Sequence, residues 1–312
     1  MINKSIKCPN CSNIISVKGK PGEQIFITCP KCKTEGKFTF PKFKTDDKKQ
    51  DCFTKLEDKC FTRLRNFNVV MGIIHIFQGI LMLLLSDLDK LATVTTSYLT
   101  FDPQLETLVS ADPEIVLEIP LAPLVALFLF MSATAHFLLA TVLYDWYVKN
   151  LKKHMNKARW IEYAFSASLM IWIIAMLTGI YDIGTLIALF TLTMVMNLMG
   201  LMMEVHNQTT KKTDWTSYII GCIAGFVPWV VIFISLMAAQ VYSGGQVPDF
   251  VIVIFITIAV FFNLFAINMV LQYKKIGKWA DYLYGEKMYI VLSLVAKSAL
   301  AWQVFAGTLQ PV

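Results

Sequence analysis

The sequence predicts an all-α membrane protein: a seven-transmembrane-helix bundle preceded by a small β zinc ribbon, with an extracellular β-hairpin in one loop. The first observation is composition, because 56% of the 312 residues are hydrophobic and only 16% are charged, whereas a soluble domain has about a quarter charged. The second is distribution, since a bilayer-spanning helix needs roughly 20 mostly apolar residues. Seven segments meet that length: about 66–86, 120–147, 159–181, 184–205, 215–239, 249–273 and 283–309.

Two Cys-x-x-Cys motifs separated by seventeen residues lie near the N-terminus. Between them, Ile14–Lys18 and Gln24–Thr28 have strand composition and are joined by a turn that contains Pro21. Cysteines at this spacing are typical of a structural Zn²⁺ site with four tetrahedral thiolates, and two disulfides are the alternative. A segment this small buries too little apolar surface to fold alone, so the metal supplies much of its stability. The expected ligands are Cys8, Cys11, Cys29 and Cys32.

These features divide the chain into three expected parts. The zinc ribbon covers residues 1–40, a charged linker covers 41–62, and the membrane domain covers 63–312.

The charge of the loops alternates along the chain. Residues 1–65 hold fifteen Lys and Arg against seven Asp and Glu, whereas 86–119 hold one Lys against seven acids. Lysines return at 149–157, 211–212 and 274–287. Since basic loops stay in the cytoplasm, we expect a multi-pass protein of the cell membrane with a cytoplasmic N-terminus and an extracellular C-terminus. Topology and membrane lipid account for the basic loops, so no nucleic-acid partner is expected.

The long acidic loop contains two extended segments. β-Branched and aromatic residues are frequent in Ala92–Phe101 and Glu114–Ile119, which we expect to pair as a hairpin on the extracellular face. No internal repeat is visible in the sequence, which argues against a transporter built from duplicated halves.

One lysine lies deep inside the last apolar segment. Lys297 is about 14 residues from the inner end, or roughly 20 Å at 1.5 Å per residue, too deep to reach the interface easily. An ionisable group at this depth marks function, and it must be paired, deprotonated or covalently modified. Glu162 is the expected partner, because the sequence places no other carboxylate well inside a span. Arg159, Ser166 and Met170 share its helical face.

Three further polar side chains fall near mid-depth in the first two spans: His75, Gln78 and His136. A membrane histidine often only hydrogen-bonds a neighbouring helix. The alternative is one polar cluster that these residues form with Glu162, and the sequence leaves both open.

The seven helices, the deep lysine and the motifs around it resemble those of the heliorhodopsins, retinal-binding rhodopsins with an inverted orientation. The resemblance covers residues 62–310, and the ribbon is an addition outside the family pattern. The motifs that carry it are the long loop after the first helix, His75-x-x-Gln78, Arg159-Trp-x-Glu162-Tyr and Ser-x-x-x-Lys297-Ser.

The resemblance implies all-trans-retinal as the cofactor, bound to Lys297 as a protonated Schiff base with Glu162 as the counterion. It also implies a homodimer. Around the Schiff base, we expect Ser293, Ser166, His75, His136, Gln78 and Arg159. The polyene needs an apolar, aromatic-lined slot. For its walls we expect Met170, Asn197, Trp229 and Phe262.

The relay positions favour a light sensor, which is neither an enzyme nor a pump. Proton pumps carry acidic, Thr and acidic residues at i, i+4 and i+11 of the third helix, where this chain has Glu162, Ser166 and Ile173. Pumps also carry an Asp four residues before the lysine, where this chain has Ser293. Two of the three relay carboxylates are therefore absent. The ribbon is then an output or docking module for a cytosolic protein. A light-driven ion transporter and a zinc-ribbon membrane scaffold without chromophore are the alternatives.

Overall fold

The computed structural model describes residues 2–20, 22–40 and 47–311, with side chains described for 4–20, 22–40 and 59–311. The chain divides into two compact units, Met1–Cys60 and Phe61–Val312, and each is described by itself.

The first unit contains two antiparallel hairpins. Strand β1 (Ile2–Lys7) pairs with β2 (Ile14–Gly19), and β3 (Gln24–Thr28) pairs with β4 (Glu35–Thr39). Each Cys-x-x-Cys motif forms the turn of one hairpin. The two predicted strands exist as β2 and β3, but they do not form one hairpin together. Instead β2 pairs with β1 and β3 pairs with β4, because the chain reverses direction at each cysteine motif.

A fully buried aromatic ring forms the core of this unit. Phe40 has no exposed surface, and a Cβ atom added at Gly19 would lie only 2.2 Å from its ring. Phe40 also bonds through its backbone to Glu23 and Gly22. A glycine is therefore required where β2 ends, because any side chain there would collide with Phe40.

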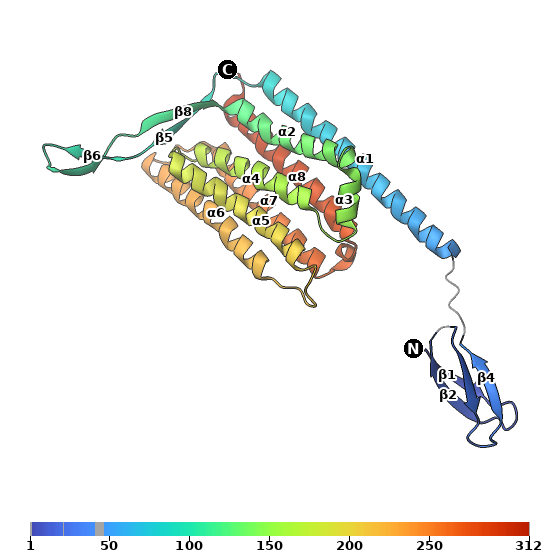
Figure 1. Ribbon diagram of the computed structural model, residues 1–312. Helices are drawn as coiled ribbons and strands as arrows, with labels where there is room; N and C mark the ends of the chain where they lie inside the picture. The colour runs from blue at the N-terminus through green and yellow to red at the C-terminus, as the bar shows by residue number, and fades with distance from the viewer. Residues whose placement is uncertain (1, 21, 41–46, 312) are drawn as a thin grey trace. The chain divides into compact units, whose positions relative to one another are not determined.

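The second unit is a helical bundle (Figure 1). Within the described residues, seven helices are long and apolar enough to cross a membrane, as the sequence predicts. The α-helices of the chain are α1 (Asp47–Leu85), α2 (Leu121–Ala140), α3 (Tyr144–Leu151), α4 (Lys157–Leu177), α5 (Ile183–His206), α6 (Thr216–Tyr242), α7 (Asp249–Tyr273) and α8 (Tyr282–Val304). The short turns η1 (Gly277–Ala280) and η2 (Phe305–Leu309) flank α8.

Two helix boundaries differ from the prediction. The helix expected over 120–147 ends at Ala140, and α3 begins after a three-residue turn. Arg65 Nε donates to Ala140 O at 2.7 Å and Thr141 Oγ1 donates to Phe137 O at 2.6 Å, so side chains satisfy carbonyls that a continuing helix would use. Helix α1 begins at Asp47, inside the expected linker, since residues 47–62 contain no Gly or Pro to stop it.

The loop between α1 and α2 forms the expected hairpin in two stages. Strand β5 (Leu91–Thr96) pairs with β8 (Glu114–Pro120), and β6 (Leu99–Asp102) pairs with β7 (Thr107–Ser110) beyond a register shift. Its base is fixed to the bundle, since Thr95 N donates to Tyr181 O at 2.9 Å. Asp182 next to it caps α5, and hydrogen bonds from Thr185 lower the pKa of its carboxyl.

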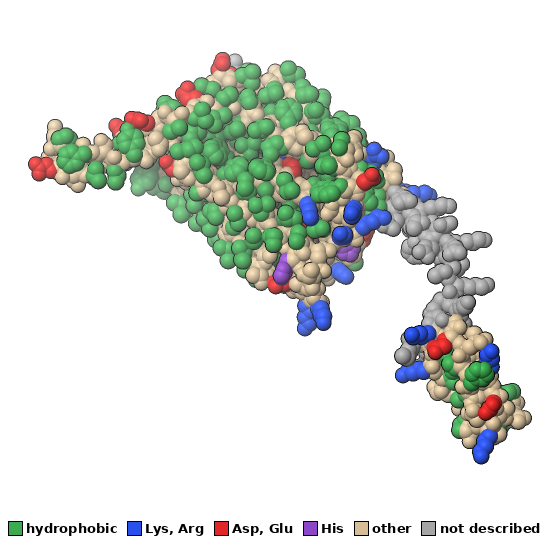
Figure 2. Space-filling model, in the orientation of Figure 1, with side chains coloured by type: hydrophobic (Ala, Val, Ile, Leu, Met, Phe, Trp, Pro, Cys, Tyr) green, Lys and Arg blue, Asp and Glu red, His purple; other side chains and the backbone are tan. Residues whose placement is uncertain are grey.

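Helix α4 is the central helix of the bundle. Of the most apolar 18-residue stretch of α4, 67% is buried inside the bundle, whereas 17% of the corresponding stretch of α7 is buried. On the visible face, Lys and Arg gather at the end of the bundle opposite the hairpin, and Asp and Glu gather along the hairpin (Figure 2). The centre of α4 is therefore where polar side chains lie furthest from water.

Candidate functional site

Three side chains from three helices form a hydrogen-bonded triad in the middle of the bundle. Lys297 on α8 is 3% exposed, and its Nζ lies 2.7 Å from Glu162 Oε1 on α4. Ser132 on α2 lies between them. Its Oγ accepts from Lys297 Nζ at 2.5 Å and donates to Glu162 Oε1 at 2.7 Å. The lysine expected to need a partner at this depth thus has two, and only one of them was predicted.

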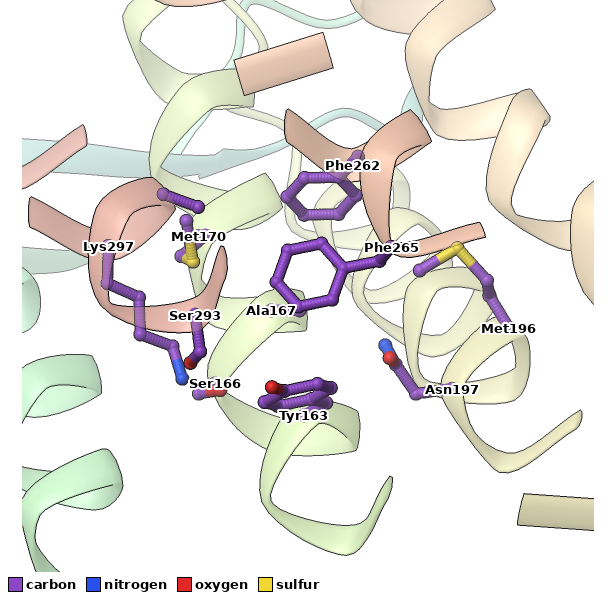
Figure 3. Close-up of a pocket in the computed structure, with 11 residues that line it drawn as sticks. Tyr163, Ser166, Ala167, Met170, Met196, Asn197, Phe262, Phe265, Ser293 and Lys297 are labelled. Carbon is purple, nitrogen blue, oxygen red and sulfur yellow. The ribbon is translucent and has the colours of Figure 1, made fainter. Parts of the chain in front are cut away.

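An apolar cavity of about 380 Å³ adjoins the triad. Lys297 and Ser293 lie on one side of it and Met196 and Asn197 on the other (Figure 3). The expected residues Ser166, Met170, Asn197, Phe262 and Ser293 all line it, together with Tyr163, Ala167, Met196, Phe265, Ala296 and Lys297.

Trp229, expected in the pocket wall, does not line the cavity. Its ring packs edge-to-face against Phe262 at 5.4 Å and Phe255 at 5.6 Å. It therefore supports the wall from behind. Its position in an apolar helix carried no signal that could separate these two roles.

Some lining residues that the sequence analysis missed follow from helical periodicity. Tyr163, Ala167 and Met170 share a face of α4 at intervals of four and three residues. Phe265 similarly lies three residues after Phe262 on α7. Residues three or four positions from each predicted lining residue lie on the same helical face and are therefore also expected to line the cavity.

The two histidines stack between α1 and α2, with ring centroids 5.6 Å apart and an interplanar angle of 16°. His136 Nδ1 lies 2.7 Å from Asn68 Oδ1, whereas neither ring nitrogen of the fully buried His75 has a hydrogen-bond partner in the described part of the chain. Gln78 does not join them, because its Oε1 accepts from Trp302 Nε1 at 3.0 Å.

A second cavity of about 370 Å³ has polar walls and adjoins Glu162. His136, Asn68 and Ser132 line it together with Glu162. His136 thus bonds a neighbouring helix and also shares a cavity with Glu162, whereas His75 and Gln78 do not line that cavity. Ser166, by contrast, lies outside this cavity, and its Oγ has no hydrogen-bond partner among the described residues.

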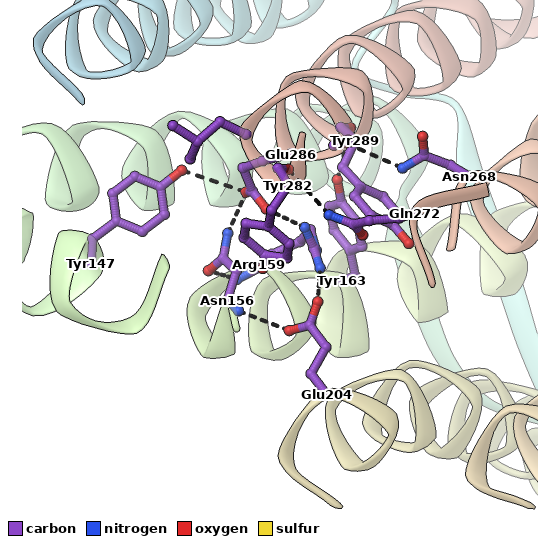
Figure 4. A network of polar contacts seen from close by, with 12 residues as sticks. Tyr147, Asn156, Arg159, Tyr163, Glu204, Asn268, Gln272, Tyr282, Glu286 and Tyr289 are labelled. Atoms are coloured by element: carbon purple, nitrogen blue, oxygen red, sulfur yellow. Dashed lines mark hydrogen bonds and ion pairs between the residues drawn. The ribbon is translucent and has the colours of Figure 1, made fainter. Parts of the chain in front are cut away.

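Arg159, expected beside Lys297, belongs to a cluster of buried polar side chains (Figure 4), and it also lines the second cavity. Its guanidinium forms ion pairs with Glu204 on α5 and Glu286 on α8. Asn156 Nδ2 donates to Glu286 Oε1 at 2.5 Å, and Asn156 N donates to Glu204 Oε2 at 2.8 Å. Arg159 also lies over the Tyr289 ring at 3.8 Å.

This cluster corrects the expectation that Glu162 is the only carboxylate well inside a span. The side chains of Glu204 and Glu286 are each 1% exposed. Both occupy helix ends, in the last turn of α5 and the second turn of α8, where a sequence reading expects contact with water. The loop that contains Asn156 folds over them and buries them.

The four cysteines of the first unit converge at the tips of its two hairpins. Their Sγ atoms all lie within 4.8 Å of one another. The pairs Cys8–Cys32 and Cys11–Cys29 are 3.6 Å apart, far beyond a disulfide and close to the edge of about 3.8 Å that a tetrahedron with Zn–S bonds of about 2.3 Å has. The set therefore fits a bound metal, and the disulfide alternative is wrong.

Comparison with known proteins agrees with the geometry of the bundle. The family model for heliorhodopsins matches residues 64–309, which includes the triad, both cavities and the Arg159 cluster and leaves out the cysteine unit. A search of curated proteins gives no match. The matched residues cover most of the chain, and it belongs to the heliorhodopsin family.

Proposed function

We propose that this chain is a light sensor in which Lys297 holds all-trans-retinal through a protonated Schiff base and Glu162 is the counterion. Family membership supports a photoreceptor of the retinal rhodopsin type in general. The observation that carries the finer assignment is the position of Lys297, in the wall of the 380 Å³ cavity and 2.7 Å from Glu162.

The residues present fit the polyene. Met, Phe and Ala side chains form most of the cavity wall, and its polar groups lie mainly near the lysine. When bound, retinal supplies light absorption and isomerisation. Glu162 favours a positive charge on the lysine nitrogen, and Ser132 orients the carboxylate toward it. The low exposure of both charged groups, 3% and 10%, keeps water from screening the pair.

The polar cavity offers a place for a proton that moves away from Lys297. Glu162 and His136 both line it, and His136 bonds Asn68 on α1. A change of charge there alters the contact between α1 and α2 and biases the helices between two packings. Because α1 is one helix from Asp47 to Leu85, we propose that it carries the change toward the ribbon, an output or docking module for a cytosolic protein.

Transport is the second candidate, and the positions of a pump relay oppose it. Ile173 is fully buried in the apolar core of the bundle, and Ser293 lies where pumps carry a carboxylate. We therefore propose neither ion pumping nor an enzyme activity. The proposal also includes a cytoplasmic N-terminus, an extracellular C-terminus and a homodimer, which the alternating loop charges and the family resemblance favour.

The test is a visible spectrum of the protein expressed with all-trans-retinal. The wild type should show a visible band, and Lys297→Ala should lose it. Lys297→Arg is the matched control, because it keeps a cation at this position but cannot form the imine. A band that persists in either variant would exclude attachment at Lys297. A light-induced pH change in cell suspensions that a protonophore abolishes would establish pumping instead.

For the first unit, we propose one Zn²⁺ bound by Cys8, Cys11, Cys29 and Cys32. Since metal binding provides most of the folding free energy of such a ribbon, chelation should speed amide exchange throughout residues 2–40. The visible band should not change, because the cysteines lie outside the family match. Zinc analysis of Cys29→Ser gives the control. Retention of one zinc by that variant would contradict the ligand set.

A further inference from the structure

One aromatic ring of the ribbon faces outward. Of the three phenylalanines on the second hairpin, Phe40 is fully buried and Phe38 packs edge-to-face against it at 5.2 Å. Phe26, at the centre of β3, is 82% exposed. Its ring therefore adds almost nothing to the core of the ribbon. A single exposed apolar side chain is common on a protein surface, so the charges around this ring decide whether it marks a contact.

The charge around this ring is positive. Lys37 is the direct partner of Phe26 across the strands, and its Nζ lies 5.5 Å from the centre of the ring. Lys31 and Lys33 are exposed in the turn of the same hairpin. Residues 4–40 hold seven lysines against two glutamates. The excess of five stays positive even if a zinc with four thiolates subtracts two.

We propose that the β3–β4 face of the ribbon docks on the anionic lipid surface of the membrane that the bundle spans. Phe26 enters the headgroup layer, and Lys37, Lys31 and Lys33 lie over lipid phosphates. Aromatic rings flanked by lysines bind at such an interface. Each lysine near an anionic leaflet strengthens binding by about fivefold. This inference does not depend on retinal binding.

Two observations favour lipid over nucleic acid. All basic residues of 1–40 are lysines, point charges suited to a diffuse anionic surface, whereas arginine is the residue that recognises nucleic acid through paired hydrogen bonds. Among the ribbon side chains that the structure describes, Phe26 is the one large aromatic that is mostly exposed, whereas strand binding uses aromatics on which successive bases stack.

The covalent connection between the ribbon and the first membrane span also favours docking on the membrane. Residues 47–58 belong to α1 and add about 18 Å before the span that begins at Lys59, and the six residues 41–46 reach at most roughly 20 Å. The membrane surface is thus present at a high effective concentration, so that even weak contacts produce docking.

Amide hydrogen exchange of the full chain in lipid nanodiscs tests the proposal. Peptides from residues 22–40 should exchange more slowly in discs that contain about one third phosphatidylglycerol than in phosphatidylcholine alone. High salt should remove the difference, because it screens exposed charges. Zinc content, measured on each sample, shows that the ribbon is folded.

Two charge reversals on the same face of β4 provide matched variants, since Glu35 and Lys37 are two residues apart and both exposed. Lys37→Glu should weaken docking by roughly 25-fold and Glu35→Lys should strengthen it by a similar factor, because each changes the charge by two. Phe26→Ser should weaken docking in low and high salt alike.

Equal exchange in the two lipids, with zinc bound, would overturn the proposal. So would equal behaviour of the two charge reversals. Protection that appears only when a single-stranded oligonucleotide is added to phosphatidylcholine discs would assign the face to nucleic acid instead.

Discussion

Two buried charge clusters share α4, and they are built in opposite ways. Glu162 faces one lysine and one hydroxyl beside an apolar cavity. Arg159, three residues earlier, binds two carboxylates at once and lies over the Tyr289 ring. The first cation has a single carboxylate partner beside the apolar cavity, whereas the second is held between two carboxylates.

The choice of cation explains the difference. Arginine is always charged and forms paired hydrogen bonds in a fixed geometry, so Arg159 fastens α4 to α5 and α8 through Glu204 and Glu286. A buried lysine can lose its proton or react with a carbonyl. We therefore propose that Lys297 carries the chemistry and that the Arg159 cluster holds together the helices on which Lys297 and Glu162 lie.

Removal of the arginine should have the largest effect. Arg159→Met leaves Glu204 and Glu286 buried without a cation, which costs about 3–5 kcal/mol and lowers the unfolding midpoint by roughly 10 °C. Thermal unfolding in detergent measures it. The control is Lys153→Met at an exposed position, expected within about 0.5 kcal/mol of the wild type. If both variants unfold at the same temperature, Arg159 does not hold the bundle together.

The histidine pair should show a smaller, asymmetric effect. His136→Phe leaves Asn68 Oδ1 without its partner and should cost about 1–3 kcal/mol. His75→Phe, the matched change in the same stack, breaks no hydrogen bond between described residues and should cost less than about 1 kcal/mol. Unfolding midpoints distinguish the two, and equal losses would show that the bond to Asn68 contributes nothing.

The serine of the triad should have the smallest effect on stability. Ser132→Ala removes the hydroxyl between Lys297 and Glu162 and should cost about 1 kcal/mol. It should also shift the visible band slightly. Ser168→Ala is the control, since the Ser168 hydroxyl bonds only Ala164 O on its own helix. A band shift of equal size in both variants would mean that Ser132 has no special relation to the triad.

Much of the fold could be predicted from the sequence, because long apolar runs and cysteine spacing are local signals. The seven spans, the hairpin after α1 and the convergence of four cysteines all follow from them. Strand pairing in the ribbon could not be predicted. The strands Ile14–Lys18 and Gln24–Thr28 could pair with each other in one hairpin, or each could pair with another strand in two hairpins, and their sequences fit both arrangements. The break after Ala140 depends on Arg65, which lies far away in the sequence.

The residues of the site that could be predicted are those whose burial in a membrane costs the most free energy. A charged lysine and a charged glutamate are costly to bury alone, so the pairing of Lys297 with Glu162 could be predicted from the sequence. Ser132 costs little anywhere in a helix and gave no signal. Glu204 and Glu286 were missed for a different reason: they occupy helix ends, and only the folded loop around Asn156 shows that they are buried.

The most direct test of this division of roles compares the absorption maximum of the retinal-bound wild type with those of Glu162→Gln and Glu204→Gln. A carboxylate beside a positively charged nitrogen holds the charge there. Its loss lets the charge spread along the polyene and moves the band to longer wavelength. We predict that shift for Glu162→Gln and an unmoved band for Glu204→Gln. A band that stays in place in Glu162→Gln, or moves equally in both variants, would contradict the assignment of Glu162 as the counterion.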